Sequence, residues 1–179
     1  MDTYKLKWTV LELEIFSFLC VTAGEKFSQR DIAKTLKFSP TAVANAVKSL
    51  LKKGFIHVEK TKTINFVSFN RENEKAIELK RAENLKQIYI SGLSEFLEEQ
   101  FPGTTIILFG SYSRGEDTKS SDIDFAIIGA KDKMLNIEKF ENNFRKEINL
   151  NMYNSWKEIH KHLKNNILNG IILSGSVDV

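Results

Sequence analysis

The sequence is poor in cysteine and contains no long hydrophobic run. Cys20 is the single cysteine among 179 residues, which excludes a disulfide framework and a zinc site built from several thiolates within the chain. No apolar run approaches the length of about 20 residues that spans a bilayer, and the N-terminus lacks the basic-then-apolar pattern of a secretory signal. We therefore expect a cytoplasmic protein that has no membrane partner.

Net charge is also low, at +3, but it is unevenly distributed along the chain. Residues 1–70 carry eleven Lys or Arg against six Asp or Glu, whereas residues 71–179 carry fifteen against seventeen. A basic first part and a mildly acidic second part predict different binding partners. We find no internal repeat or low-complexity segment, and the length fits one medium domain or two small ones.

The first part of the chain predicts three helices, each with a recognisable start or stop signal. Gly24 ends a first apolar helix, and Ser28 is a suitable N-cap for a second. Ser39 followed by Pro40 combines an N-cap with proline at the first helical position, and Gly54 is a typical residue just after a helix end. The predicted helices cover residues 8–21, 29–36 and 40–53.

Two β-rich runs, residues 55–60 and 64–69, follow around a polar tip and predict a hairpin. Three helices and then a hairpin resemble the winged-helix DNA-binding domains of prokaryotic transcriptional regulators, over residues 8–70. The resemblance implies double-stranded DNA as a partner. It also allows a homodimer, because such regulators commonly dimerise to read paired half-sites.

The polar face of the third predicted helix is the candidate recognition surface. In a winged helix this face enters the major groove, where asparagine can read adenine and lysine can hold phosphate. Lysines at the hairpin tip suit phosphate or minor-groove contacts. A solvated helix face and a protein-interaction module are the alternative interpretations. The candidate DNA-binding residues are Thr41, Asn45, Lys48, Lys52, Lys60 and Lys62.

Residues 71–100 are helical in pattern, with Asn70 as a possible N-cap and a break near Ser91-Gly92. This predicts a winged-helix domain at 1–70, a helical linker at 71–90 and a second domain at 91–179. The second domain should be an α+β fold with a mixed β-sheet and helices on one side of it. The expected strands are 104–109, 122–128 and 147–153, and the expected helices are 112–116, 134–145 and 155–168.

One motif in the second domain indicates chemistry. A strand that ends in Gly110-Ser111 and opens a short helix presents backbone N–H groups to a phosphate, and Ser111 can add a hydroxyl donor. Asp122 and Asp124 are two residues apart on a later strand, so both side chains point to one face. Two carboxylates beside a phosphate cradle can bind Mg²⁺ bridged to triphosphate oxygens.

The runs Gly110-Ser111-Tyr112-Ser113-Arg114-Gly115 and Ser121-Asp122-Ile123-Asp124-Phe125 resemble the polymerase-β-like minimal nucleotidyltransferases, over roughly residues 85–175. The resemblance implies Mg²⁺ as cofactor and ATP or another nucleoside triphosphate as substrate or ligand. It places the metal at Asp122 and Asp124. The implied nucleotide-binding residues are Gly110, Ser111, Arg114 and Ser121.

The resemblance also implies a third catalytic carboxylate on a later strand. Glu147, Asn149 and Asn151 share the alternate face of that strand, so Glu147 is the candidate third catalytic residue and the other two positions are amides. Two hypotheses remain. The protein is a DNA-associated, Mg-dependent nucleotidyltransferase that acts on an unknown acceptor, which could be a protein or toxin-like partner. Alternatively, it is a DNA-binding regulator whose second domain is catalytically degenerate and serves nucleotide sensing or dimerisation.

Overall fold

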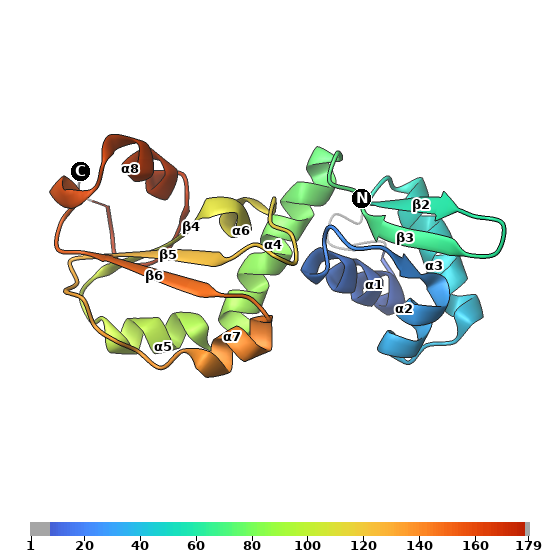
Figure 1. The fold of residues 1–179 in the computed structure, drawn as a ribbon, viewed down its shortest axis with the longest axis horizontal. Coiled ribbons are helices and arrows are strands. Elements are labelled where there is room, and N and C mark those ends of the chain that lie inside the picture. Colours follow the sequence, from blue (N-terminus) through green and yellow to red (C-terminus); the bar gives the residue numbers. More distant parts are fainter. Residues whose placement is uncertain (1–7, 178–179) are drawn as a thin grey trace, which may run out of the picture. The chain divides into compact units, whose positions relative to one another are not determined.

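The computed structural model describes residues 8–177 of the chain. It divides into two compact units, Met1–Ile77 and Glu78–Val179, and the division falls inside helix α4 (Glu74–Ile90) (Figure 1). None of the helices among the described residues has the length and apolar character needed to cross a membrane.

The first unit has the element order of a winged helix. The hairpin strands β2 and β3 are antiparallel, with Ile56 opposite Phe69 at one end and Lys60 opposite Asn65 at the other. Strand β3 also pairs with the short strand β1. Strand β1 is absent from the sequence prediction because two residues carry no periodic signal. The elements are α1 (Val10–Val21), β1 (Phe27–Ser28), α2 (Gln29–Leu36), α3 (Pro40–Lys52), β2 (Ile56–Lys60) and β3 (Asn65–Phe69).

The capping residues predicted from the sequence for α2 and α3 act as caps in the structure. The Ser28 hydroxyl accepts a hydrogen bond from the Asp31 N–H, and the Ser39 hydroxyl accepts one from the Ala42 N–H. Gly54 has φ +76° just after α3, a left-handed conformation that favours glycine. Local chemistry therefore fixes the helix boundaries, and the apolar faces of α1, α2 and α3 then pack into a shared core around Ile15, Ile32, Leu50 and Val67.

Glu12 is a buried acid that ties α1 to α3. Its carboxylate accepts the Thr9 N–H at 2.8 Å and lies 3.2 Å from Lys53 Nζ. Burial alone would raise the pKa of Glu12, but hydrogen bonds from Ser49, Thr9 and Lys53 outweigh it, so the pKa lies below the ordinary value of 4.5. The carboxylate thus favours the folded state in its ionised form.

Replacing Glu12 by glutamine should therefore change the acid stability of this unit. The ionised carboxylate contributes stability above pH 4.5, and that contribution is lost as the pH falls through the lowered pKa of the folded state. We expect E12Q to lose about 1–3 kcal/mol at neutral pH, with the difference from wild type shrinking below pH 4.5. Urea unfolding followed by Trp8 fluorescence in a W156F background measures it. The exposed neighbour variant E14Q is the control, and equal pH profiles for E12Q and wild type would contradict the prediction.

Helix α4 begins later than predicted, and its N-cap is Asn73 rather than Asn70. The Asn73 side-chain oxygen accepts the Ala76 N–H at 3.0 Å, whereas Asn70 donates to the Gly54 carbonyl at 2.8 Å. Asn70 thus closes the turn after α3. The predicted break is confirmed, because Gly92 has φ +73° between α4 and α5 (Leu93–Gln100).

The second unit is built on a four-stranded mixed sheet in the order β6-β5-β4-β7. Strand β5 runs parallel to β6 and antiparallel to β4, and β4 runs antiparallel to β7. This confirms the α+β class. The elements are β4 (Thr105–Phe109), α6 (Gly110–Arg114), β5 (Ile123–Ile128), α7 (Glu138–Phe144), β6 (Ile148–Tyr153), the 3₁₀ turn η1 (Trp156–Glu158), α8 (Lys161–Leu168) and β7 (Ile171–Ser174).

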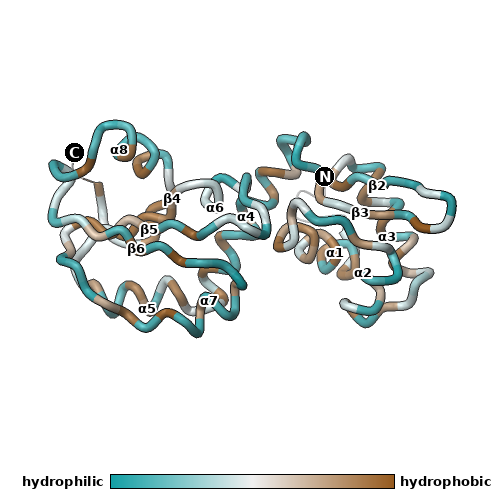
Figure 2. Tube along the Cα trace, viewed as in Figure 1, coloured by the Kyte–Doolittle hydropathy of each residue, from teal (hydrophilic) through white to brown (hydrophobic). Residues whose placement is uncertain are grey.

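Helices cover both faces of this sheet, and the prediction that they lie on one side is wrong. One core joins Leu108, Phe125 and Ile127 to α5 and α7, and the other joins Ile107 and Ala126 to the α8 side. Figure 1 shows α5 and α7 below the sheet and α8 above it, and Figure 2 shows hydrophobic residues along β4 and β5. The single helix predicted at 155–168 is interrupted, because the chain leaves η1 in extended conformation before α8 starts.

Candidate nucleotide and metal site

The site is built around Gly110, where β4 passes into α6. Gly110 has φ +76°, and a Cβ atom at this position would lie 2.6 Å from Asp124 Oδ2. The left-handed backbone favours glycine, and a Cβ here would force the Asp124 carboxylate or the turn to move. The register of β4 and β5 explains the proximity, since Phe109 is paired with Asp124.

Asp122 and Asp124 lie together, as their spacing predicts. The Asn149 side-chain nitrogen donates to Asp122 Oδ2 at 3.4 Å and to Asp124 Oδ1 at 3.1 Å. One amide thus contacts both carboxylates, which places them on the same face of the sheet. Asp122 is exposed and Asp124 is half-buried, so both remain accessible to a ligand.

Asn149 lies opposite Asp124, in the register of the parallel strands β5 and β6. Glu147 precedes β6, its side chain is exposed, and its backbone carbonyl accepts the Ile123 N–H at 2.9 Å. Among residues 8–177, no group of three or more His, Cys, Asp or Glu side chains could hold a metal ion. A catalytic role for Glu147 stays a prediction, and an amide faces the two aspartates.

The other predicted nucleotide-binding residues make contacts within the domain. Arg114 donates from Nε to Glu116 at 2.8 Å and from Nη1 to Asn166 of α8 at 3.1 Å. The Ser121 hydroxyl accepts the Thr118 N–H at 2.9 Å. These bonds shape the start and end of the loop at 116–121. Ser111 is half-buried on α6, and nucleotide contacts by these residues stay predictions.

A buried polar cluster that the sequence analysis missed lies under this loop. Asp117 contacts Lys80 through Oδ1 and lies 3.3 Å from Lys146 Nζ through Oδ2, while Asn84 donates to Asp117 Oδ1 at 2.7 Å. The pKa of Lys146 lies below its ordinary value, chiefly because the ammonium group is buried. The positive charge of Lys80 lowers this pKa further, whereas the negative charges of Asp117 and Asp122 raise it.

A sequence signal for half of this cluster exists. Lys80 and Asn84 stand four and eight residues after Ala76 and continue the same helical stripe to Ile88, and all four side chains are buried. Polar residues inside an apolar stripe indicate buried partners. Lys146 and Asp117 lie outside regular elements, so nothing in their local sequence predicts their burial.

The residues fit a magnesium ion bound together with a triphosphate. Mg²⁺ prefers hard oxygen ligands and is commonly held by one or two carboxylates plus substrate phosphates. Asp122 and Asp124 supply two such carboxylates, and Gly110 lets the backbone lie against Asp124 without a side chain in between.

The candidate DNA-binding residues of the first unit are all exposed, and the four on α3 share one helix face. The four α3 residues, Thr41, Asn45, Lys48 and Lys52, are all exposed, and their spacing of four, three and four puts them on one helix face. Lys60 ends β2 and Lys62 lies in the tip between β2 and β3, and both are exposed. DNA binding by these residues stays a prediction.

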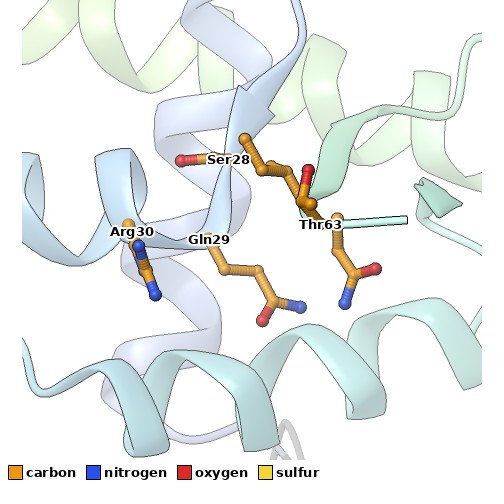
Figure 3. A pocket seen from close by; sticks show the side chains of 6 residues that line it. Ser28, Gln29, Arg30 and Thr63 are labelled. Atoms are coloured by element: carbon orange, nitrogen blue, oxygen red, sulfur yellow. The ribbon is translucent and has the colours of Figure 1, made fainter. Parts of the chain in front are cut away.

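A cavity of about 190 Å³ opens between the start of α2 and the hairpin tip. Ser28, Gln29 and Arg30 line one side, and Thr63, Ile64 and Asn65 line the other (Figure 3). None of the metal-site residues lines it. Asp31, which does not line the cavity, accepts the Ser28 N–H at the start of α2.

Comparison with protein families identifies a nucleotidyltransferase domain at residues 90–174. This match contains α6, β5 and β6 with all the residues of the candidate metal site. The second unit therefore has the nucleotidyltransferase fold that the sequence motif predicts. The comparison with curated proteins gives no match.

Solved structures similar to the chain are winged-helix regulators. The adhesin competence repressor AdcR from Streptococcus pyogenes is 20% identical over 56% of this chain and 72% of its own, with a TM-score of 0.41. ZitR from Lactococcus lactis, a zinc-responsive MarR family member, is 23% identical over 56% and 68%, with a TM-score of 0.40. ZitR in complex with DNA is 21% identical over 56% and 67%, with the same TM-score. At these values the winged-helix assignment rests on the element order and strand pairing described above.

Proposed function

We propose that the protein is a DNA-binding regulator whose nucleotidyltransferase-fold domain binds Mg²⁺ with ATP or another nucleoside triphosphate but does not transfer the nucleotide efficiently. The observation that carries this proposal is the position of Asn149, which faces Asp124 and hydrogen-bonds both aspartates. A homodimer that reads paired half-sites, and a cytoplasmic location, belong to the same proposal.

Nucleotidyl transfer needs an acceptor oxygen to attack the α-phosphorus while the bond to pyrophosphate breaks, and the acceptor must give up its proton. An amide has no carboxylate charge and does not accept that proton at neutral pH. The Asn149 side-chain amide donates hydrogen bonds to Asp122 and Asp124 but adds no charge. The two aspartates are then the carboxylates that would hold the metal, with two negative charges between them. When bound, Mg²⁺ would neutralise charge on the triphosphate.

DNA binding is supported by the surface of α3 and by charge. The face with Asn45, Lys48 and Lys52 is exposed, and residues 1–70 carry the basic excess of the chain. An exposed helix face that carries lysine and asparagine favours contact with phosphates and base edges of the major groove.

A second candidate function, nucleotidyl transfer to a protein or nucleic-acid acceptor, is favoured by the intact motif at Gly110, Ser111, Asp122 and Asp124. In that case Asp122 and Asp124 would position the metal and a separate group would take the acceptor proton. A toxin-like protein partner is one acceptor that fits this alternative.

One experiment separates the two functions. Wild type, D122N/D124N and N149D are incubated with ATP labelled at the α-phosphate, Mg²⁺ and a cell lysate as acceptor source, and calorimetry measures Mg²⁺-dependent ATP binding in parallel. We expect wild type to bind without labelling an acceptor and D122N/D124N to lose binding. Label transfer by wild type that D122N/D124N lacks would establish the enzyme instead. Transfer gained by N149D alone would show that Asn149 suppresses the chemistry.

A further inference from the structure

Three charged side chains are buried together under the loop at 116–121. The Lys80, Asp117 and Lys146 side chains are 0%, 1% and 4% exposed. Removing an ion from water costs several kcal/mol, and well-packed apolar residues often stabilise a fold equally well. Two cations with one carboxylate also leave an excess positive charge inside the domain. Burial of these charges is therefore weak evidence that the cluster serves the stability of the fold.

The cluster holds the loop at both ends. Asp117, near the loop start, is bound by Lys80 and Asn84 from α4 and by Lys146 from the chain just before β6. The Lys146 ammonium also donates to the carbonyl oxygens of Thr118 and Ser121, the latter at 3.0 Å. The Ser121 carbonyl belongs to the peptide bond that leads into Asp122, so Lys146 fixes the backbone next to a metal-site carboxylate.

The same cluster also holds the helix that Gly110 opens. Asn84 donates to the Tyr112 carbonyl oxygen at 2.9 Å as well as to Asp117. The Tyr112 ring lies 6.0 Å from Lys80 Nζ and 5.9 Å from Lys146 Nζ, within the range of cation–π attraction. The same set of buried side chains thus contacts both halves of the motif, α6 and the segment that leads into β5.

We propose that Lys146 and Lys80, acting through Asp117, are positioning residues for the nucleotide and metal site. They hold the loop so that Asp122 stays beside Asp124 and the Gly110-Ser111 turn. This inference rests on the proposed binding of Mg²⁺ and a nucleoside triphosphate. Neither lysine touches the nucleotide in this scheme, because both ammonium groups are already bound to the loop.

The test compares K146M with K131M, which removes the same charge from an exposed position of the same domain. Calorimetry measures Mg²⁺–ATP affinity at a temperature at which circular dichroism shows each variant to be folded. We expect K146M to bind Mg²⁺–ATP about tenfold more weakly than wild type, which corresponds to about 1.4 kcal/mol of binding free energy. K131M should bind as wild type does. A purely structural role would lower Tm and leave the affinity of the folded protein unchanged, which would overturn the proposal.

A second measurement, amide hydrogen exchange, tests the positioning role without relying on nucleotide binding. Hydrogen exchange of the amides at 118–123 is measured in wild type, K146M and K80M, and K80M removes the contact with Asp117 from α4. We expect faster exchange in these amides in both variants and little change in β4. Exchange at wild-type rates in the folded variants contradicts the proposal. If wild type itself fails to bind Mg²⁺–ATP, the proposed function fails, while the exchange data still decide whether the lysines position the loop.

Discussion

Replacing Gly110 by alanine is expected to weaken Mg²⁺-dependent ATP binding by at least about tenfold. The new Cβ would lie 2.6 Å from Asp124 Oδ2, so the carboxylate or the β4–α6 turn must move. The left-handed backbone at φ +76° adds a cost of roughly 1–2 kcal/mol for a residue with a side chain. Calorimetry for binding and thermal unfolding for stability measure the two effects separately.

Gly103 provides a matched control for this substitution. It has φ +77°, yet a Cβ there would have nothing within 4 Å. G103A should therefore carry the backbone cost alone and lower stability without weakening ATP binding. If G110A binds Mg²⁺–ATP as wild type does, the Gly110–Asp124 contact is not part of a nucleotide site. If both variants lose binding equally, backbone strain rather than the displaced carboxylate is responsible.

The double variant K48A/K52A is expected to reduce DNA affinity strongly and to make the remaining binding less dependent on salt. Each phosphate contact contributes a slope of about 0.9 in log affinity against log salt, so the loss of two contacts should reduce the slope by about two. N45A should act differently, because a base contact affects some sequences and not others. Fluorescence anisotropy at several KCl concentrations measures both, with duplexes enriched by wild type from a random library.

The control pair K131A/K157A removes the same net charge from exposed positions of the second unit. It should leave both the affinity and the salt slope close to those of wild type. Equal losses in the two double variants would mean that overall charge, and not the α3 face, attracts DNA. An unchanged affinity in K48A/K52A would contradict a recognition role for α3 and favour a protein-interaction module.

Much of the fold could be predicted because its signals are local. Ser39-Pro40, Gly54 and Gly92 act through their own backbone geometry and capping bonds, so helix boundaries near them are where the sequence places them. Strand β1 could not be predicted, because its pairing with β3 is decided by residues about 40 positions away in the chain. The same holds for α8, whose side of the sheet depends on the path of the chain around it.

The nucleotidyltransferase motif was visible in the sequence alone, because two aspartates at alternate strand positions must share a face and Gly110-Ser111 at a strand end suits a phosphate. The sequence also showed amides at the strand expected to supply a third carboxylate. Tertiary structure decided the rest. The register of β5 and β6 set Asn149 opposite Asp124, and the packing of α4 against the loop at 116–121 buried Lys80, Asp117 and Lys146 together. Pairings between distant segments depend on how whole elements pack, and no local pattern of residues encodes them.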